Sequence, residues 1–267
     1  MKWVDNLPMR APSPVLMALE SRAFFEWSSL AVSWPILRRA PRGDGHPVLV
    51  LPGLIANDAS TWALRRYLQS RGYVAYPWNA GFNLGPRNGT VEKLEQRVAT
   101  LFRRHERAVS LIGWSLGGAM ARALAVRMPE HVRSVITLGS PIQGHHSGTN
   151  AWRIFELVSG WKADDPRLAE WLADHPIAPS TSFLSKTDGV VSWRMSMAPE
   201  HDLSENIAVN ATHMGMGANP IVLWAIADRL AQEEGQWQPL ARNSTLRSLL
   251  YRDPKKARLV DLLASRG

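Results

Sequence analysis

The chain of 267 residues contains no cysteine and no block of like charges. Without cysteine there can be no disulfide, no thiolate metal ligand and no cysteine nucleophile. The net charge is +8, but the arginines that carry it are scattered along the chain. A nucleic-acid-binding arm is therefore not indicated, and we expect no nucleic-acid partner. A basic solvated surface is the simplest interpretation of the charge, with attraction to anionic lipid or acidic substrates as the alternative.

The sequence also has little that resembles a secretory signal, and it has no long apolar run. Asp5 and three prolines occupy the N-terminal region where a signal peptide would have its apolar core. The longest uncharged stretch nearby, residues 27–37, is too short to span a bilayer. We therefore expect no cleavable signal and a cytoplasmic protein, with peripheral attachment to a membrane as the alternative.

Apolar runs rich in valine and leucine alternate with segments of helical periodicity, a pattern typical of a parallel sheet with right-handed crossovers. We expect an α/β fold whose mostly parallel central sheet carries helices on both faces. The predicted strands are residues 47–53, 73–78, 108–114, 134–140, 181–185 and 206–211, and the predicted core helices are residues 60–72, 90–107, 116–128 and 220–232.

One serine lies between a predicted strand and a predicted helix, in the stretch GWSLGG at residues 113–118. Gly113, Ser115 and Gly117 fit the pattern G-x-S-x-G. In that context the pattern predicts a nucleophile elbow, a strained turn whose small neighbours let strand and helix approach each other. Ser115 would then lie at the carboxyl ends of the strands, beside a helix N-terminus that favours developing negative charge.

A serine nucleophile needs a base and an acid, which follow it in the order acid, then histidine, in this architecture. His213 comes just after the last predicted strand in a glycine-bearing loop, so it is the expected base. Asp188 follows the preceding strand and is the expected acid, although Asp188-Gly189 is also an ordinary turn signal. The alternatives are His145, His146 and His175 for the base, and Asp164, Asp165, Glu200 and Asp202 for the acid.

The oxyanion hole needs two backbone N–H donors. Leu116, directly after the nucleophile, is one candidate. The other is Leu54, in the loop after the first predicted strand, where Gly53 allows a close turn. We expect neither a metal ion nor an organic cofactor.

Four stretches resemble those of α/β-hydrolases of the bacterial lipase/carboxylesterase type: VLVLPGL, GWSLGG, SKTDGVV and THMGM. The loop WNAGFNLGP, residues 78–86, resembles one found in lipase-like members. The resemblance implies a serine hydrolase that cleaves carboxylic esters with apolar acyl chains, acting on a small-molecule or lipid ester. A thioesterase or acyltransferase with the same triad is the alternative, and a non-catalytic binding member of the fold is a more distant one.

The remaining segments divide the chain around the core, which we expect at residues 45–140 and 181–235. Residues 141–180 form an insertion rich in large apolar groups, with helices near 150–158 and 166–174. It is interpreted as a lid or as simple packing. Residues 1–44 form an amphipathic helical segment, with Glu20 and Glu26 off its apolar stripe, and residues 236–267 form a helical tail. The N-terminal segment and the lid are the candidates for membrane contact. Candidate substrate-pocket residues are Trp114, Trp161, Trp171 and Met214.

Overall fold

The structure is a computed structural model that describes residues 10–87, 89–143, 146–168 and 174–255. Its centre is a six-stranded sheet in the order β2-β1-β3-β4-β5-β6, and every neighbouring pair of strands is parallel. This confirms the predicted fold class, an α/β-hydrolase fold. The strands are β1 (Pro47–Leu51), β2 (Val74–Pro77), β3 (Val109–Trp114), β4 (Val132–Leu138), β5 (Ser180–Leu184) and β6 (Ser204–Ala208).

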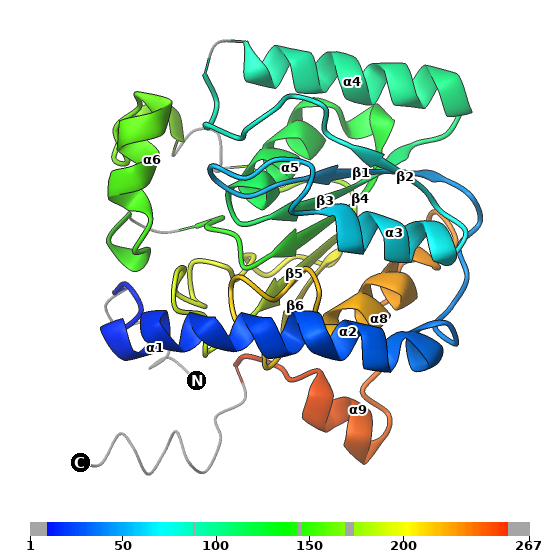
Figure 1. Cartoon of the computed structure of the whole chain (residues 1–267). Coiled ribbons are helices and arrows are strands. Elements are labelled where there is room, and N and C mark those ends of the chain that lie inside the picture. The colour runs from blue at the N-terminus through cyan, green and yellow to red at the C-terminus, as the bar shows by residue number, and fades with distance from the viewer. Residues whose placement is uncertain (1–9, 88, 144–145, 169–173, 256–267) are drawn as a thin grey trace.

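Helices cover both faces of the sheet (Figure 1). On one face, α4 (Thr90–His105) and α5 (Leu116–Arg127) pack over a cluster that includes Leu49 and Leu111. On the other face, α3 (Trp62–Ser70), α8 (Pro220–Leu230) and part of α2 (Ala23–Leu37) cover a second cluster. The central strands are buried on both faces, which explains why β1 is a continuous apolar run and why Ser110 is the one polar side chain of β3.

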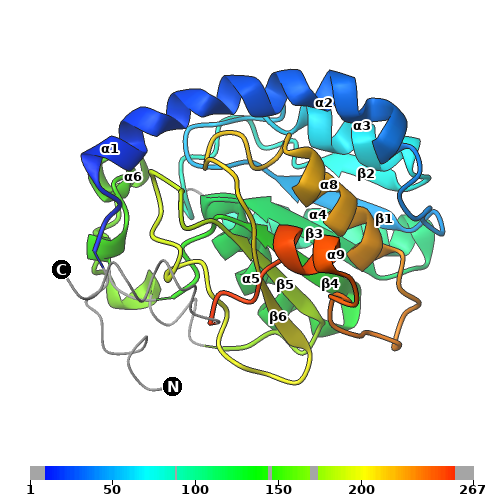
Figure 2. The same cartoon turned by 90° about the horizontal axis from the view of Figure 1, so that it is seen from below.

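Short elements complete the described chain. They are α1 (Pro14–Ala18), the 3-10 turns η1 (Leu19–Arg22), η2 (Pro129–His131) and η3 (His146–Gly148), together with α6 (Trp152–Ser159) and α9 (Thr245–Leu250). Figures 1 and 2 show α1 and α6 beside each other at one end of the sheet. The expected second helix of the insertion falls partly on residues 169–173, outside the described residues, and the end of the expected helical tail, residues 256–267, also lies outside them. Within the described chain no helix has both the length and the apolar character needed to cross a membrane.

The N-terminal segment consists of α1, the 3-10 turn η1 and α2, and α2 contains Pro35 and ends at Leu37. The prediction that Glu20 and Glu26 lie off the packed stripe is wrong. Glu20 is buried and Glu26 is half-buried, whereas Phe24 and Phe25 are 71% and 70% exposed. Hydrophobic periodicity missed these two carboxylates because it does not register the hydrogen-bond donors that lie beneath the helix.

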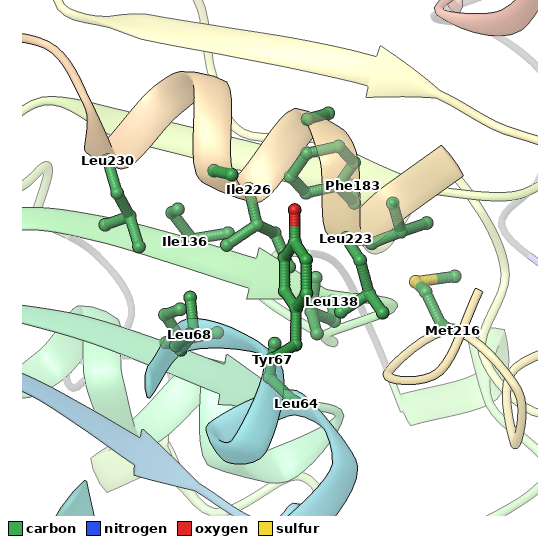
Figure 3. Packing of buried hydrophobic residues seen from close by; sticks show 14 of the residues in the cluster. Leu64, Tyr67, Leu68, Ile136, Leu138, Phe183, Met216, Leu223, Ile226 and Leu230 are labelled. Atoms are coloured by element: carbon green, nitrogen blue, oxygen red, sulfur yellow. The ribbon is translucent and has the colours of Figure 1, made fainter. Parts of the chain in front are cut away.

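Tyr67 of α3 has its hydroxyl in an apolar environment between the sheet and α8. Figure 3 shows the phenolic oxygen pointing towards Phe183, Leu223 and Ile226. Among the described residues no hydrogen-bond partner is found for it. Burial raises the pKa of Tyr67, so the hydroxyl stays neutral. A buried hydroxyl without a partner lacks the compensation for its lost hydration.

We expect Tyr67→Phe to raise the free energy of unfolding by about 1 kcal/mol, because it removes the uncompensated hydroxyl and keeps the ring. Tyr76→Phe is the matched control, since the hydroxyl of Tyr76 lies 2.8 Å from Nε2 of His105. It should lower stability by about 1 kcal/mol. Urea unfolding of the two variants measures both changes. A loss of stability in Tyr67→Phe as large as in the control would mean that the hydroxyl of Tyr67 has a partner.

Candidate active site

Ser115 occupies the sharp turn between β3 and α5, with φ 53° and ψ −124°. Non-glycine residues seldom adopt a positive φ, so the backbone is strained here. A Cβ atom on Gly113 would lie 2.2 Å from the carbonyl oxygen of Gly117, and one on Gly117 would lie 2.5 Å from that of Leu51. Both positions therefore require glycine. Ser115 itself is half-buried between the buried Trp114 and Leu116, so it is the accessible residue of the turn.

Asp188 and His213 meet in a buried pair at the carboxyl ends of β5 and β6. Oδ2 of Asp188 lies 2.8 Å from Nδ1 of His213, and the two residues are 3% and 4% exposed. Oδ1 of Asp188 accepts hydrogen bonds from the backbone N–H groups of Val190 and Val191, both at 2.8 Å. This fixes the carboxylate and assigns the proton on the neutral imidazole to Nδ1. Nε2 is then left as the acceptor.

Three observations place this pair beside Ser115. The backbone N–H of Ser115 donates to the carbonyl oxygen of Leu138, 2.8 Å away. The next residue, Gly139, faces the pair, since a Cβ atom there would lie 3.0 Å from Oδ2 of Asp188 and 3.1 Å from Nδ1 of His213. In addition, Nε1 of Trp114 donates to the carbonyl oxygen of His213 at 3.0 Å. The fold thus brings together the three residues that the sequence nominates.

The pKa of His213 reflects opposing influences. Burial lowers it, because imidazolium loses its hydration, but the charge of Asp188, its hydrogen bond and the charge of Glu20 raise it. The result is a pKa above the usual value for histidine. The charged form of the ring is therefore stabilised more than it would be in water.

Glu20 was not anticipated as a site residue. It belongs to η1 and is buried, and its carboxylate accepts hydrogen bonds from the backbone N–H groups of Gly189, His213 and Met214. No local motif marks it, because its partners lie more than 160 positions away in the sequence. Glu26 of α2 is a second such residue and binds Thr212 and Asn219.

The loop after β1 lies against the serine. A Cβ atom on Gly53 would be 3.3 Å from Cβ of Ser115, so this turn approaches the elbow closely. Asn83, fully buried, secures the loop through Nδ2 to the carbonyl oxygen of Pro52 at 2.8 Å. Its backbone also exchanges hydrogen bonds with Ile55 and Ala56. Leu54 therefore lies in a firmly held loop. Asn83 belongs to the resembling stretch at 78–86, which was the available signal for it.

The four candidate pocket residues have different positions. Trp114 is buried and contacts the loop that carries His213. Met214 follows His213 and is 54% exposed. Trp161 lines a cavity of about 440 Å³ next to Ala123 and Val126, in the second half of α5, and Arg167 stacks over its ring. Trp171 lies outside the described residues.

The alternative acids and bases lie elsewhere or are engaged. The ring of His175 stacks on that of His201, ahead of β5 and β6 and so at the amino ends of these strands. Asp165 pairs with Arg167, and Glu200 with Lys255. Asp202 precedes β6, also at the amino edge, and Asp164 is exposed in the insertion. His146 begins η3, and His145 lies outside the described residues. In the described segments no three histidine, aspartate or glutamate side chains group as metal ligands would.

A second chain of aspartate, histidine and serine occurs at the amino edge of the sheet. Nδ1 of His46 lies 2.5 Å from Oδ1 of Asp44, and Nε2 lies 2.9 Å from Oγ of Ser110. His46 and Ser110 are fully buried, so no substrate reaches this serine. Burial, with the charges of Arg133 and Arg107, lowers the pKa of His46 to about 4, despite Asp44. We therefore interpret this group as a structural hydrogen-bond chain.

Comparisons with known proteins bear on the fold and the chemistry. The lysosomal thioesterase PPT2 homolog of Drosophila melanogaster is 26% identical over 177 residues, which are 57% of this chain and 61% of that protein. A pimeloyl-[acyl-carrier protein] methyl ester esterase of Aeromonas hydrophila is 34% identical over 102 residues, which are 37% of this chain and 39% of that protein. The chain thus matches less than two thirds of the length of either relative.

Solved structures agree on the fold. Mature lipase BlEst2 of Bacillus licheniformis superposes with a TM-score of 0.54 at 14% identity, covering 73% of this chain and 95% of that one. Lipase B of Aspergillus fumigatus gives a TM-score of 0.52 at 15% identity, covering 71% of this chain and 53% of that one. At such identity these likenesses show the fold alone.

A family model extends the assignment from fold to family membership. The model of the palmitoyl protein thioesterase family matches residues 47–182, just over half of the chain, from β1 through the elbow and into β5. It includes Ser115 and the loop with Leu54, whereas Asp188 and His213 lie beyond it. The chain thus has the α/β-hydrolase fold, and it belongs to the palmitoyl protein thioesterase family.

Proposed function

We propose that the protein hydrolyses thioesters of apolar acyl chains, and more slowly the corresponding oxygen esters, through a triad of Ser115, Asp188 and His213. The observation that carries the proposal is the buried hydrogen bond between Asp188 and His213 beside a strained, accessible serine. The sequence alone favoured an esterase and kept the thioesterase as its alternative. Membership in a thioesterase family favours that alternative.

In this mechanism Oγ of Ser115 attacks the acyl carbonyl carbon while Nε2 of His213 takes its proton. Asp188 holds the imidazole in the required tautomer and stabilises the imidazolium. The backbone N–H groups of Leu54 and Leu116 stabilise the oxyanion, and the second of these is at the N-terminus of α5. Collapse of the tetrahedral intermediate breaks the carbon–sulfur bond and leaves an acyl-enzyme, and the departing thiolate sulfur takes the proton from the imidazolium of His213 to leave as a thiol. Water activated by the same histidine then releases the fatty acid.

The deciding experiment compares kcat/KM for acyl thioesters and oxygen esters that share one acyl chain, at acetyl, butyryl, octanoyl and dodecanoyl lengths. We expect the thioester to be preferred at each length, and longer chains to be preferred within each series. A clear preference for oxygen esters would return the assignment to carboxylesterase. Transfer of the acyl group to an added alcohol or thiol in place of water would indicate an acyltransferase.

We expect Ser115→Ala to be folded and to lose on the order of 10⁶-fold in kcat, as is usual for a triad nucleophile. A fluorophosphonate probe should label the unaltered protein at Ser115 and leave the variant unlabelled. Ser110→Ala is the matched control, because its serine belongs to the buried chain at the amino edge. It should keep both activity and labelling. Near-normal hydrolysis by Ser115→Ala would refute the triad, and an unaltered protein that is folded but neither labels nor turns over would be a binding protein.

The base must be neutral to accept the proton from Ser115. Because Asp188 and Glu20 raise the pKa of His213, kcat/KM should increase with pH through a pKa above 6.5 and then level off. Activity should therefore be lost at a higher pH than an unperturbed histidine would give. A pH profile of kcat/KM with a non-titrating thioester measures this. An acid limb at pH 6 or below would contradict the assigned electrostatics.

Met214 offers an apolar side chain directly beside the base, and its backbone is held on both sides, by Glu20 and by Nε1 of Trp27. Each methylene buried against such a surface changes binding about fourfold. We expect Met214→Ser to lower the dodecanoyl-over-butyryl ratio of kcat/KM several-fold. Ile177→Ser is the control, since Ile177 is 71% exposed but precedes β5 at the opposite edge of the sheet. Equal ratios in both variants would remove Met214 from the acyl site.

A further inference from the structure

The segment formed by α1, η1 and α2 packs on the core through Leu37, Leu30 and Trp34 of α2, but it also turns two carboxylates inward and two phenylalanines outward. Its carboxylates Glu20 and Glu26 face the protein, while Phe24 and Phe25 are mostly exposed. Figure 2 shows this segment running along one side of the molecule, with α2 beside α3 and α8. Burying a carboxylate is unfavourable unless donors replace its lost hydration. The donors that these two carboxylates meet therefore explain the orientation of the segment.

Glu20 connects the two loops that carry the acid and the base. Its Oε1 accepts from the backbone N–H groups of Gly189, at 2.8 Å, and His213, at 3.0 Å. Its Oε2 accepts from Met214 at 2.9 Å. One carboxylate thus holds the residue after the proposed acid, the proposed base itself and the residue after the base. The Asp188–His213 hydrogen bond joins the same two loops through their side chains.

Glu26 secures the other end of the base loop. It accepts from the backbone N–H of Thr212 at 3.1 and 3.2 Å, from the hydroxyl of Thr212, and from Nδ2 of Asn219 at 2.8 Å. Asn219 is also the N-cap of α8, so the loop is held from its start to the helix that follows it.

The loops that carry Asp188 and His213 have glycine where the N-terminal segment approaches them most closely. A Cβ atom on Gly189 would lie 2.4 Å from the carbonyl oxygen of Leu16, and one on Gly215 would lie 1.7 Å from Oε2 of Glu26. A side chain at residue 189 would collide with backbone, and one at residue 215 would displace the Glu26 carboxylate from its hydrogen bonds to Thr212 and Asn219. Both loops therefore have glycine where the N-terminal segment lies against them.

We infer that Glu20 is a positioning residue for the reaction, which holds the acid and base loops together and places a second negative charge behind the imidazolium of His213. This inference rests on the proposed function. It assigns part of the catalytic apparatus to residues 14–37, which lie outside the match to the family model. Glu26 supports the loop without the electrostatic part of this role.

The charges around His213 are consistent with this division. Asp188, from the loop after β5, and Glu20, from η1, raise the pKa of His213 against the effect of burial. Glu26, from α2, contacts Thr212 and Asn219 rather than the histidine. Two further residues lie against His213: Trp114, at the end of β3, and Gly139, just after β4. Both are uncharged.

The test compares full-length Glu20→Gln with the unaltered protein and with Glu233→Gln, which removes one negative charge from an exposed position after α8. Glutamine in place of Glu20 keeps one acceptor oxygen but loses the charge. We expect kcat on the pH plateau to fall about tenfold or more, because the acid and base loops lose their hydrogen bonds to a charged acceptor. KM should change little, and the acid limb of kcat/KM should move to lower pH. Glu233→Gln should match the unaltered protein.

The inference requires both a lower plateau of kcat and a shifted acid limb of kcat/KM in Glu20→Gln. A lower plateau with an unshifted acid limb would mean that Glu20 has only a structural role. A shifted acid limb with a normal plateau would mean that Glu20 does not position the loops, so either result overturns the inference. Glu26→Gln separates the two effects, since it should lower the plateau and leave the limb in place. If Glu20→Gln does not fold, Glu20→Asp keeps the charge with a shorter reach. For this variant, kcat on the pH plateau should fall, while the acid limb of kcat/KM should stay at the pH of the unaltered protein. An unchanged kcat would refute the role of Glu20 in holding the two loops together.

The proposed function fails separately. In that case the unaltered protein would neither hydrolyse thioesters nor label at Ser115. The imidazole of His213 can still be titrated by NMR in the unaltered protein and in Glu20→Gln. We expect a lower pKa in the variant, and an identical pKa would overturn the charge role whatever the outcome of the activity assay.

Discussion

The site depends on how closely β3 and α5 approach each other. Side chains at Gly113 or Gly117 would collide with backbone atoms, and a Cβ atom on Gly118 would lie 1.9 Å from Oγ of Ser140. Glycine at these three positions allows the helix to begin immediately after the strand. Ser115, at the turn itself, must then adopt a positive φ and project beyond the strand ends. The strain is tolerated because both flanking elements are buried in the core.

The other parts of the site are loops, which have no such intrinsic rigidity and are held by hydrogen bonds to buried polar groups. Asn83 secures the loop after β1, and Asp188 is itself fixed by two backbone N–H groups. The loop of His213 relies on Glu20 and Glu26 from the N-terminal segment. A buried carboxylate that accepts several backbone donors is well suited to this, because the donors of an irregular loop have no regular secondary structure to satisfy them.

The sequence predicted the fold correctly because its signals are local. Strand runs, helix periodicity and cap residues such as Asn219 each operate within a few positions, and the elbow glycines do so too. Ser115, Asp188 and His213 could be nominated because each follows a recognisable strand in a fixed chain order. Glu20 and Glu26 could not, since their partners are separated from them by more than 160 residues. Periodicity assigns charged residues to the solvent-exposed face of a helix. Here the backbone N–H groups of distant loops draw Glu20 and Glu26 to the buried face instead.

The two chains of aspartate, histidine and serine show why residue types alone do not define a site of this kind. Both histidines are buried, and burial lowers the pKa of each. At the amino edge Asp44 also pairs with Arg107 and Arg133, whose positive charges oppose an imidazolium, and the pKa of His46 falls to about 4. At the carboxyl edge Asp188 contacts uncharged backbone N–H groups besides His213, and Glu20 adds a second negative charge. The imidazole of His46 is therefore held neutral, whereas that of His213 accepts a proton more readily than a free imidazole does. What distinguishes the two is the sign of the charges behind the aspartate–histidine pair, and at the carboxyl edge part of that charge comes from the N-terminal segment.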